Sequence, residues 1–160
     1  MASVLTPRSW FRKISSLLYP PKTKKEGLQK LSLPSSKKNH YDLQDIFNEV
    51  NTKYFCSSLA LPITWSRKGN KQAKRVVRLG SYHLKTQKIK INPVLDSPHV
   101  PRYVVAFIVY HEVLHHLFPP LENPGSKRRI HHPLFMQKER EFEEYEEVQA
   151  FLKTSKKKLF

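Results

Sequence analysis

The chain carries the stretch HEVLH at residues 111–115, and the apolar run YVVAFIV at residues 103–109 comes just before it. A continuous apolar run of this kind predicts a buried helix over about residues 102–117. On a helix, His111 and His115 lie about one turn apart on the same face. Both imidazoles can therefore reach one metal ion, and we expect the fold to form around this motif helix.

The residue types of this stretch match a catalytic zinc site. Neutral imidazole binds zinc near neutral pH, and a catalytic zinc keeps three protein ligands and one open position. Glu112 follows the first histidine and can take a proton from a water that the metal activates. The pattern predicts one zinc ion per chain, with His111 and His115 as ligands and Glu112 as the general base.

A third ligand must come from outside this stretch. The candidates are the helix glutamates and five further histidines, His83, His99, His116, His131 and His132. His116 follows His115 directly and points about 100° away from it on a helix, so it is a poor candidate. His131 and His132 precede the final predicted helix, where a loop can fold either one back onto the motif helix. The spacing alone leaves both open.

Length and composition limit the classes of protein to which the chain can belong. The chain has 160 residues, 39% of them hydrophobic, which fits one modest domain with polar extensions. The single cysteine, Cys56, excludes an internal disulfide and a cysteine-based zinc ribbon. No apolar run approaches the roughly 18 residues that cross a membrane, so we expect no transmembrane segment.

We expect three parts along the chain. Residues 1–40 form a basic tail, disordered or loosely docked, because its Pro, Ser and Lys residues are poor material for a core. Residues 41–153 form the folded domain, and residues 154–160 form a basic end. The tail lacks the apolar segment of a secretory signal, although its composition also suits an organelle transit peptide. The expected location is the cytoplasm or the nucleoid.

Hydrophobic periodicity predicts an α+β domain. A helix over residues 42–55 is followed by three strands, at residues 61–65, 76–82 and 84–92. The short connections favour antiparallel pairing. Gly80 breaks the second strand, which indicates a bulge or a close approach of the backbone to a neighbouring element. The final helix ends near residue 153, and we expect its run of glutamates to face solvent.

The net charge is +16 and is unevenly distributed. Residues 1–40 hold nine Lys or Arg and one acidic residue, and residues 41–110 hold eleven and four. Six of the basic residues form a cluster ahead of the motif helix, namely Arg67, Lys68, Lys71, Lys74, Arg75 and Arg78. Such a cluster favours a surface for polyanions, with DNA or RNA as the first candidate and an anionic membrane as the second. The simpler alternative is that the charge serves solubility.

Several further stretches extend the pattern around HEVLH. They are NxxNxxYF at residues 48–55, LPITWS at 61–66, LGSY at 79–82, IKINP at 89–93 and HHPLF at 131–135. In this order, over about residues 42–150, the chain resembles the SprT-like family of zinc metallopeptidases, which includes the Spartan DNA-repair proteases. The resemblance implies a minimal zincin, with a small antiparallel sheet of about three strands packed on the motif helix and flanking helices. It also implies His131 as the third ligand, four residues before Phe135, and a protein or peptide substrate.

The pattern and the resemblance together predict a zinc-dependent metalloendopeptidase, with proteins bound to nucleic acid as one class of substrate. An extended substrate would pair with an exposed edge of the strand at residues 76–82. The alternative is a non-catalytic, basic nucleic-acid-binding module with a structural zinc. Glu112 argues against this alternative, because a structural site closes with four protein ligands and needs no base.

Overall fold

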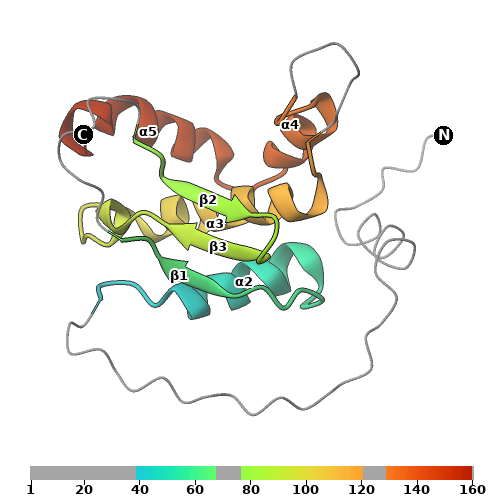
Figure 1. The fold of residues 1–160 in the computed structure, drawn as a ribbon. Coiled ribbons are helices and arrows are strands. Elements are labelled where there is room, and N and C mark those ends of the chain that lie inside the picture. The colour runs from blue at the N-terminus through green and yellow to red at the C-terminus, as the bar shows by residue number, and fades with distance from the viewer. Residues whose placement is uncertain (1–38, 68–76, 121–128, 160) are drawn as a thin grey trace.

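The computed structural model describes residues 39–67, 77–120 and 129–159 (Figure 1). The tail predicted over residues 1–40 therefore lies almost wholly outside the described residues. In chain order the described elements are α2 (Leu43–Phe55), β1 (Ile63–Trp65), β2 (Gly80–His83), β3 (Lys88–Ile91), the 3-10 helix η1 (Pro93–Leu95), α3 (Arg102–Leu117), α4 (Pro133–Glu139) and α5 (Tyr145–Leu159).

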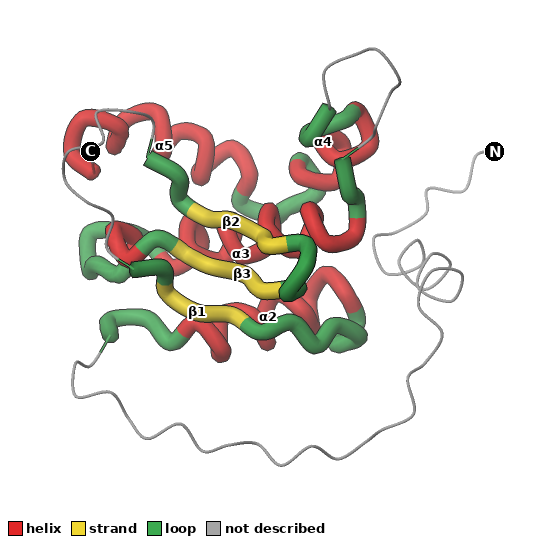
Figure 2. Tube along the Cα trace, viewed as in Figure 1, coloured by secondary structure: helices red, strands yellow, loops and turns green. Residues whose placement is uncertain are grey.

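Helix α3 is the predicted motif helix, and it lies at the centre of the fold. It contacts the helices α2, α4 and α5 as well as the strands β2 and β3. The three strands form one layer in front of α2 and α3 (Figures 1 and 2). Because several elements cover α3, its sequence is apolar around most of its circumference. None of the helices that the described residues form is long and apolar enough to span a membrane.

The sheet differs from the expected antiparallel sheet in one pairing. β2 and β3 pair antiparallel, with Tyr82 opposite Ile89, but β1 pairs with β3 in parallel, with Ile63 opposite Ile89. The strand order is β1-β3-β2, so the sheet is mixed. Short connections favour antiparallel pairing only between strands that follow one another in sequence. β1 and β3 are separated by enough chain for a parallel pairing, and that chain includes β2.

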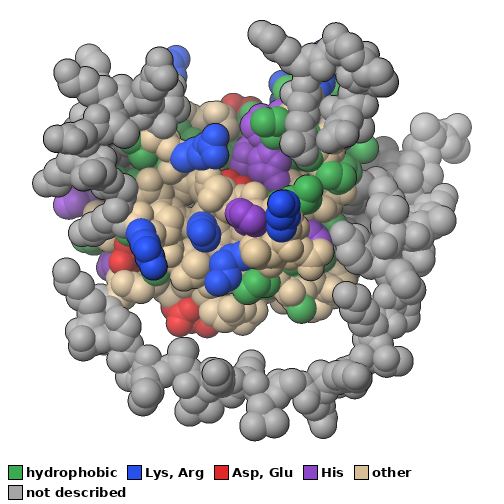
Figure 3. Space-filling view, in the orientation of Figure 1, with side chains coloured by type: hydrophobic (Ala, Val, Ile, Leu, Met, Phe, Trp, Pro, Cys, Tyr) green, Lys and Arg blue, Asp and Glu red, His purple; other side chains and the backbone are tan. Residues whose placement is uncertain are grey.

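The sheet has one buried face and one exposed face. Ile89 and Ile91 of β3 are fully buried in the core that includes α3, whereas Lys90 between them is exposed. This is the period-two alternation predicted for residues 84–92. Basic side chains therefore lie over the outer face of the strands (Figure 3).

Helix α2 forms as predicted and packs against both α3 and β1. The carboxylate of Asp42 caps the helix by accepting hydrogen bonds from the N–H groups of Gln44 and Asp45. The buried amide of Asn51 donates to the carbonyl of Leu59 at 2.8 Å and accepts from its N–H at 3.2 Å. These two bonds hold the chain in place just ahead of β1.

The predicted final helix is divided into α4 and α5 by turns at residues 140–144. The break places Phe142 in an aromatic cluster, with its ring centroid 5.4 Å from those of both Tyr54 and Tyr110. The Glu143 N–H also donates to the Tyr54 hydroxyl at 3.1 Å. Burial of Phe142 therefore overrides the helical pattern of the sequence. α5 continues to Leu159, beyond the predicted end near residue 153.

Candidate metal centre

Three histidine side chains meet beside α3. His111 and His115 lie on α3, and His131 lies just before α4. The Nε2 atom of His115 is 3.2 Å from Nε2 of His111 and 3.2 Å from Nε2 of His131. Nitrogen ligands around a tetrahedral zinc, with bonds of about 2.0–2.1 Å, are separated by about 3.3–3.4 Å. The structure thus brings the three predicted ligands together at a spacing that fits one metal ion.

The protonation state of the cluster also fits a cation. Burial, together with the neighbouring His111 and His131, lowers the pKa of His115 to about 3. The pKa of His131 is also lowered, by burial and by His111. Both rings are therefore neutral at physiological pH, which is the form in which imidazole binds a metal. The donor set suits zinc, which prefers nitrogen ligands of this type.

Phe135 forms an apolar floor beneath the three imidazoles. Its ring centroid is 5.2 Å from that of His111, 4.8 Å from that of His115 and 4.7 Å from that of His131. The side chain is fully buried. Because Phe135 follows His131 by four residues, one turn of chain carries both the ring and the third histidine to the motif helix. The floor restricts the orientations available to the rings and prepares the site for a metal.

Glu139 is a site residue that the sequence analysis missed. Its Oε1 lies 2.6 Å from Nδ1 of His111, and about a fifth of each side chain is exposed. A carboxylate in this position accepts a hydrogen bond from Nδ1–H, which leaves the Nε2 lone pair of His111 free for a metal. The prediction that the run of glutamates faces solvent is therefore wrong for Glu139. The signal available was spacing, because Glu139 follows Phe135 by one helical turn and shares its face.

The Glu112 side chain lies against β2, and not against the floor that Phe135 forms beneath the histidines. A Cβ atom added to Gly80 would lie 2.5 Å from Oε1 of Glu112 and 2.9 Å from Cγ2 of Ile108. Only glycine lets the strand come this near to the helix, so the predicted close approach at Gly80 is confirmed. No pattern in the sequence predicts that Glu112 contacts Gly80, because the contact forms only where β2 packs on α3.

The Glu112 carboxyl group is poised for proton transfer. It is 4% exposed, and burial raises its pKa to about 7, although His111, the Tyr82 backbone and Arg78 act in the opposite direction. Its Oε2 atom is buried and has no hydrogen-bond partner among the described residues. A carboxyl group with a pKa near neutrality can both accept and release a proton at physiological pH.

His116 and His132 occupy structural positions. The Tyr82 hydroxyl lies 2.7 Å from Nδ1 of His116, so His116 contacts β2 and points away from the cluster, as predicted. His132 is buried and caps α4, where its Nδ1 accepts a hydrogen bond from the N–H of Phe135. The structure therefore places His131, and not His132, beside the two helix histidines.

A cleft of about 440 Å³ opens above the histidine cluster. Residues 80–82 of β2 form one wall, and His111, Glu112, His115 and His131 form the base. Arg78, Leu84, Pro120 and Ile130 complete the lining. Histidine side chains reach the surface here, next to apolar side chains (Figure 3).

The basic cluster is only partly described. Arg67 and Arg78 are exposed, and Arg78 lines the cleft. Lys68, Lys71, Lys74 and Arg75 lie outside the described residues. His83 and His99 are exposed, and His83 contacts Thr86 rather than the metal cluster.

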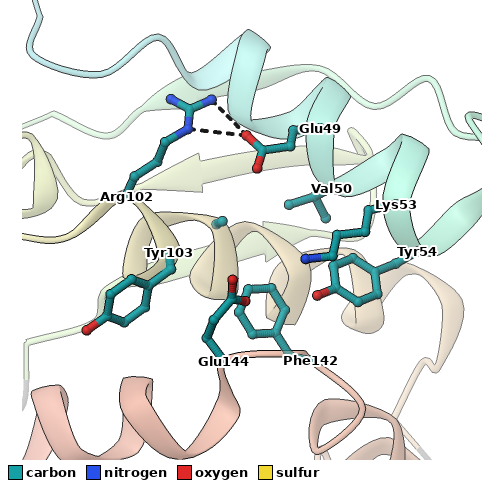
Figure 4. Close-up of a pocket in the computed structure, with 9 residues that line it drawn as sticks. Glu49, Val50, Lys53, Tyr54, Arg102, Tyr103, Phe142 and Glu144 are labelled. Carbon is teal, nitrogen blue, oxygen red and sulfur yellow. Dashed lines mark hydrogen bonds and ion pairs between the residues drawn. The ribbon is translucent and has the colours of Figure 1, made fainter.

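A second hollow, of about 300 Å³, lies between α2, α3 and the turns before α5 (Figure 4). Arg102 donates two hydrogen bonds to Oε2 of Glu49 at its edge, at 2.9 and 3.2 Å. Lys53 forms an ion pair with Glu143 close by. Opposite charges are paired around an apolar floor that includes Val50 and Phe142, and the lining holds no histidine or cysteine. Among the described residues the group placed to hold a metal is that of His111, His115 and His131, and none of the three lines this hollow.

Comparison with known proteins supports the fold. No family model and no curated protein matches the chain. Among solved structures, the crystal structure of the metallopeptidase zymogen jannalysin of Methanocaldococcus jannaschii is similar, with a TM-score of 0.53 and 19% identity. The match covers 75% of this chain and 99% of that one. The described part thus has the predicted α+β fold of the minimal zincin type, with a mixed sheet. Membership of the SprT-like family stays a prediction.

Changing His131 to Ala should remove most of the bound zinc, because the cluster would lose one of its three nitrogen ligands. His132→Ala is the matched control. It should keep its zinc and lose only about 1 kcal/mol of stability with the helix cap. Zinc per chain, measured by mass spectrometry after equilibration with a weak chelator, tests both variants. Zinc loss in His132→Ala with retention in His131→Ala would reverse the assignment.

Glu139→Gln should weaken zinc binding by about tenfold to a hundredfold, because a neutral amide is a weaker acceptor than a carboxylate for the hydrogen bond from Nδ1–H of His111. Glu146→Gln makes the same charge change at an exposed position of α5 and should leave the affinity unchanged. Competition with a chromophoric chelator measures both affinities. Equal affinities in the two variants would show that Glu139 does not orient His111.

Proposed function

We propose that this protein is a zinc-dependent metalloendopeptidase in which His111, His115 and His131 hold one zinc ion per chain. The observation that carries the proposal is the buried Glu112 carboxyl group, which lines the same cleft as the three histidines. Its pKa near 7 suits a general base. The fold shared with a metallopeptidase zymogen supports the same conclusion.

Hydrolysis of a peptide bond needs a nucleophile, a polarised carbonyl and a proton for the leaving nitrogen. When bound, a zinc ion supplies Lewis acidity, which activates water and polarises a carbonyl group. Glu112 accepts the proton from the water as the water oxygen bonds to the carbonyl carbon. Glu112 then delivers that proton to the amine nitrogen as the carbon–nitrogen bond breaks. Glu139 accepts a hydrogen bond from Nδ1–H of His111 and so holds this ring in the tautomer that leaves Nε2 free.

The substrate would lie along β2 as an additional strand. Within the three-stranded sheet β2 is an edge strand that pairs with β3, and its residues 80–82 line the cleft. An extended peptide can therefore use main-chain hydrogen bonds to this edge, which makes binding largely independent of side chains. The scissile bond would then lie between β2 and the histidine cluster.

The competing function is a nucleic-acid-binding module with a structural zinc. Such a site closes with four protein ligands. Three histidines form the group here, and the nearest carboxylates, Glu112 and Glu139, have other positions, against Gly80 and against His111. A cluster that opens onto a cleft favours catalysis.

The basic residues extend the proposal to substrates held on nucleic acid. Arg78 is exposed and lines the cleft, so phosphate groups bound near it would lie close to the site. The rest of the cluster precedes β2 in sequence. Recruitment to DNA or RNA would raise the local concentration of bound proteins around the cleft. The proposal also divides the chain into a basic tail at residues 1–40, a peptidase domain at 41–153 and a basic end at 154–160.

Glu112→Gln should keep the fold and the zinc but reduce peptide hydrolysis by about a hundredfold or more, because the amide cannot accept the proton. A zinc-loaded protein and a mixture of quenched fluorescent peptides measure turnover, and Glu146→Gln serves as the control. Unchanged turnover in Glu112→Gln would remove this residue as the base. Absence of hydrolysis in the zinc-loaded wild type would contradict the proposed function itself.

Binding to nucleic acid should depend on charge and show little sequence preference. A variant with Arg67, Lys68, Lys71, Lys74, Arg75 and Arg78 changed to Ser should bind DNA more weakly and with a smaller dependence on salt. A control variant with Lys85, Lys88 and Lys90 changed to Ser tests whether any loss of positive charge has the same effect. Salt titrations with single- and double-stranded DNA measure both. Wild-type protein that does not bind at low salt would contradict this part of the proposal.

A further inference from the structure

The cleft has an apolar end. Leu84 and Ile130 both line it, although their side chains are 55% and 51% exposed. Pro120 joins them. Leu84 follows β2, whereas Ile130 directly precedes His131, so the two side chains reach the cleft from different parts of the chain. Single exposed apolar side chains are common on protein surfaces, but Leu84 and Ile130 share one concave site with the candidate metal ligands.

The contacts between β2 and α3 define where this apolar end lies. Gly80 is placed against Glu112, and Tyr82 is placed against His116, so β2 and α3 run in the same direction. Leu84 comes after Tyr82, and Pro120 comes after the C-terminal end of α3. The apolar side chains therefore lie beyond the scissile position, toward the C-terminal end of α3. Arg78 lies at the opposite end of the strand.

We propose that this apolar end binds a large apolar side chain of the substrate, such as Leu, Phe or Met, displaced from the scissile bond toward the end of α3. This inference rests on the proposed peptidase function and names its substrate class. A peptide along β2 gains main-chain hydrogen bonds whatever its sequence, and Leu84 and Ile130 add a contact that depends on sequence. The occupant is apolar because these two side chains and Pro120 offer no charge or strong hydrogen-bond donor.

The size of the preference follows from burial. Full burial of one large apolar side chain favours binding by about tenfold to a hundredfold over a small polar one. A preference of this size makes some cleavage sites clearly better than others, while peptides without an apolar side chain at this position can still bind. The protein would therefore cut where a chain is extended and exposes apolar residues, as segments of unfolded or loosened proteins do.

Binding, measured apart from turnover, tests the inference. Zinc-loaded Glu112→Gln is titrated into labelled peptides of one polar sequence in which Leu or Ser is placed at each position in turn. At one position the Leu peptide should bind at least about tenfold more tightly than the Ser peptide. Adding Leu84→Ser and Ile130→Ser together should abolish that difference with zinc content unchanged. Leu134→Ser is the control, because Leu134 is 40% exposed on α4 and is not part of the cleft lining.

Equal binding of Leu and Ser peptides at every position would overturn the inference, as would a preference that survives the Leu84 and Ile130 changes. Cleavage of the same peptides by the zinc-loaded wild type separates the two levels of the argument. Cleavage without any apolar preference would leave the peptidase function standing and reject the apolar end. Selective binding of Leu peptides without cleavage of any peptide would reject the peptidase function and retain the assignment of the cleft.

Discussion

Strand β2 packs along one side of α3, and this packing fixes the geometry of the site. Two residues of a strand advance about 6.6 Å, and four residues of a helix advance about 6.0 Å. The two repeats nearly match, so Gly80 meets Glu112 and Tyr82 meets His116 one step further along. The strand can therefore follow this face of the helix for two contacts. Both the burial of Glu112 and the position of the cleft wall result from this match.

Helix α3 divides its sides between different tasks. Glu112 and His116 face β2, while His111 and His115 face the chain around α4. On that second side, His131, Phe135 and Glu139 follow one another at intervals of four residues and supply a ligand, a floor and a hydrogen-bond acceptor. The position of each imidazole is thus set by packing as well as by the helix. A polar site can exist beside the core because its buried groups have defined partners or open onto the cleft.

Features that depend on neighbouring residues could be predicted from the sequence. The motif helix follows from the apolar run at residues 103–109 with prolines on either side, and the close approach at Gly80 follows from a glycine inside a strand pattern. The position of His111 and His115 on one face of the helix follows from helical geometry. His131 was named through a resemblance over short stretches, since spacing alone left His132 equally open. The structure brings His131 to the cluster and assigns His132 to the helix cap.

Features that depend on distant contacts could not be predicted. The parallel pairing of β1 with β3 joins segments that are remote in sequence, and no local pattern distinguishes it from a meander. The break between α4 and α5 depends on Phe142 entering the aromatic cluster around Tyr54 and Tyr110. Glu139 appeared as one member of an acidic run, because its partner, His111, belongs to another helix.

The strand order has a consequence for how the cleft wall assembles. Tyr82 and Ile89 are paired across a hairpin and lie seven residues apart, whereas Ile63 and Ile89 are paired at a separation of twenty-six residues. Closing the shorter loop loses less chain entropy, so the β2–β3 hairpin is the local unit of this topology. β1 must then add to the edge of β3 that the hairpin leaves open. β2, which carries Gly80 and Tyr82, therefore belongs to the most local unit of the sheet. The opposite edge of the sheet is formed by β1 through the pairing of longest range.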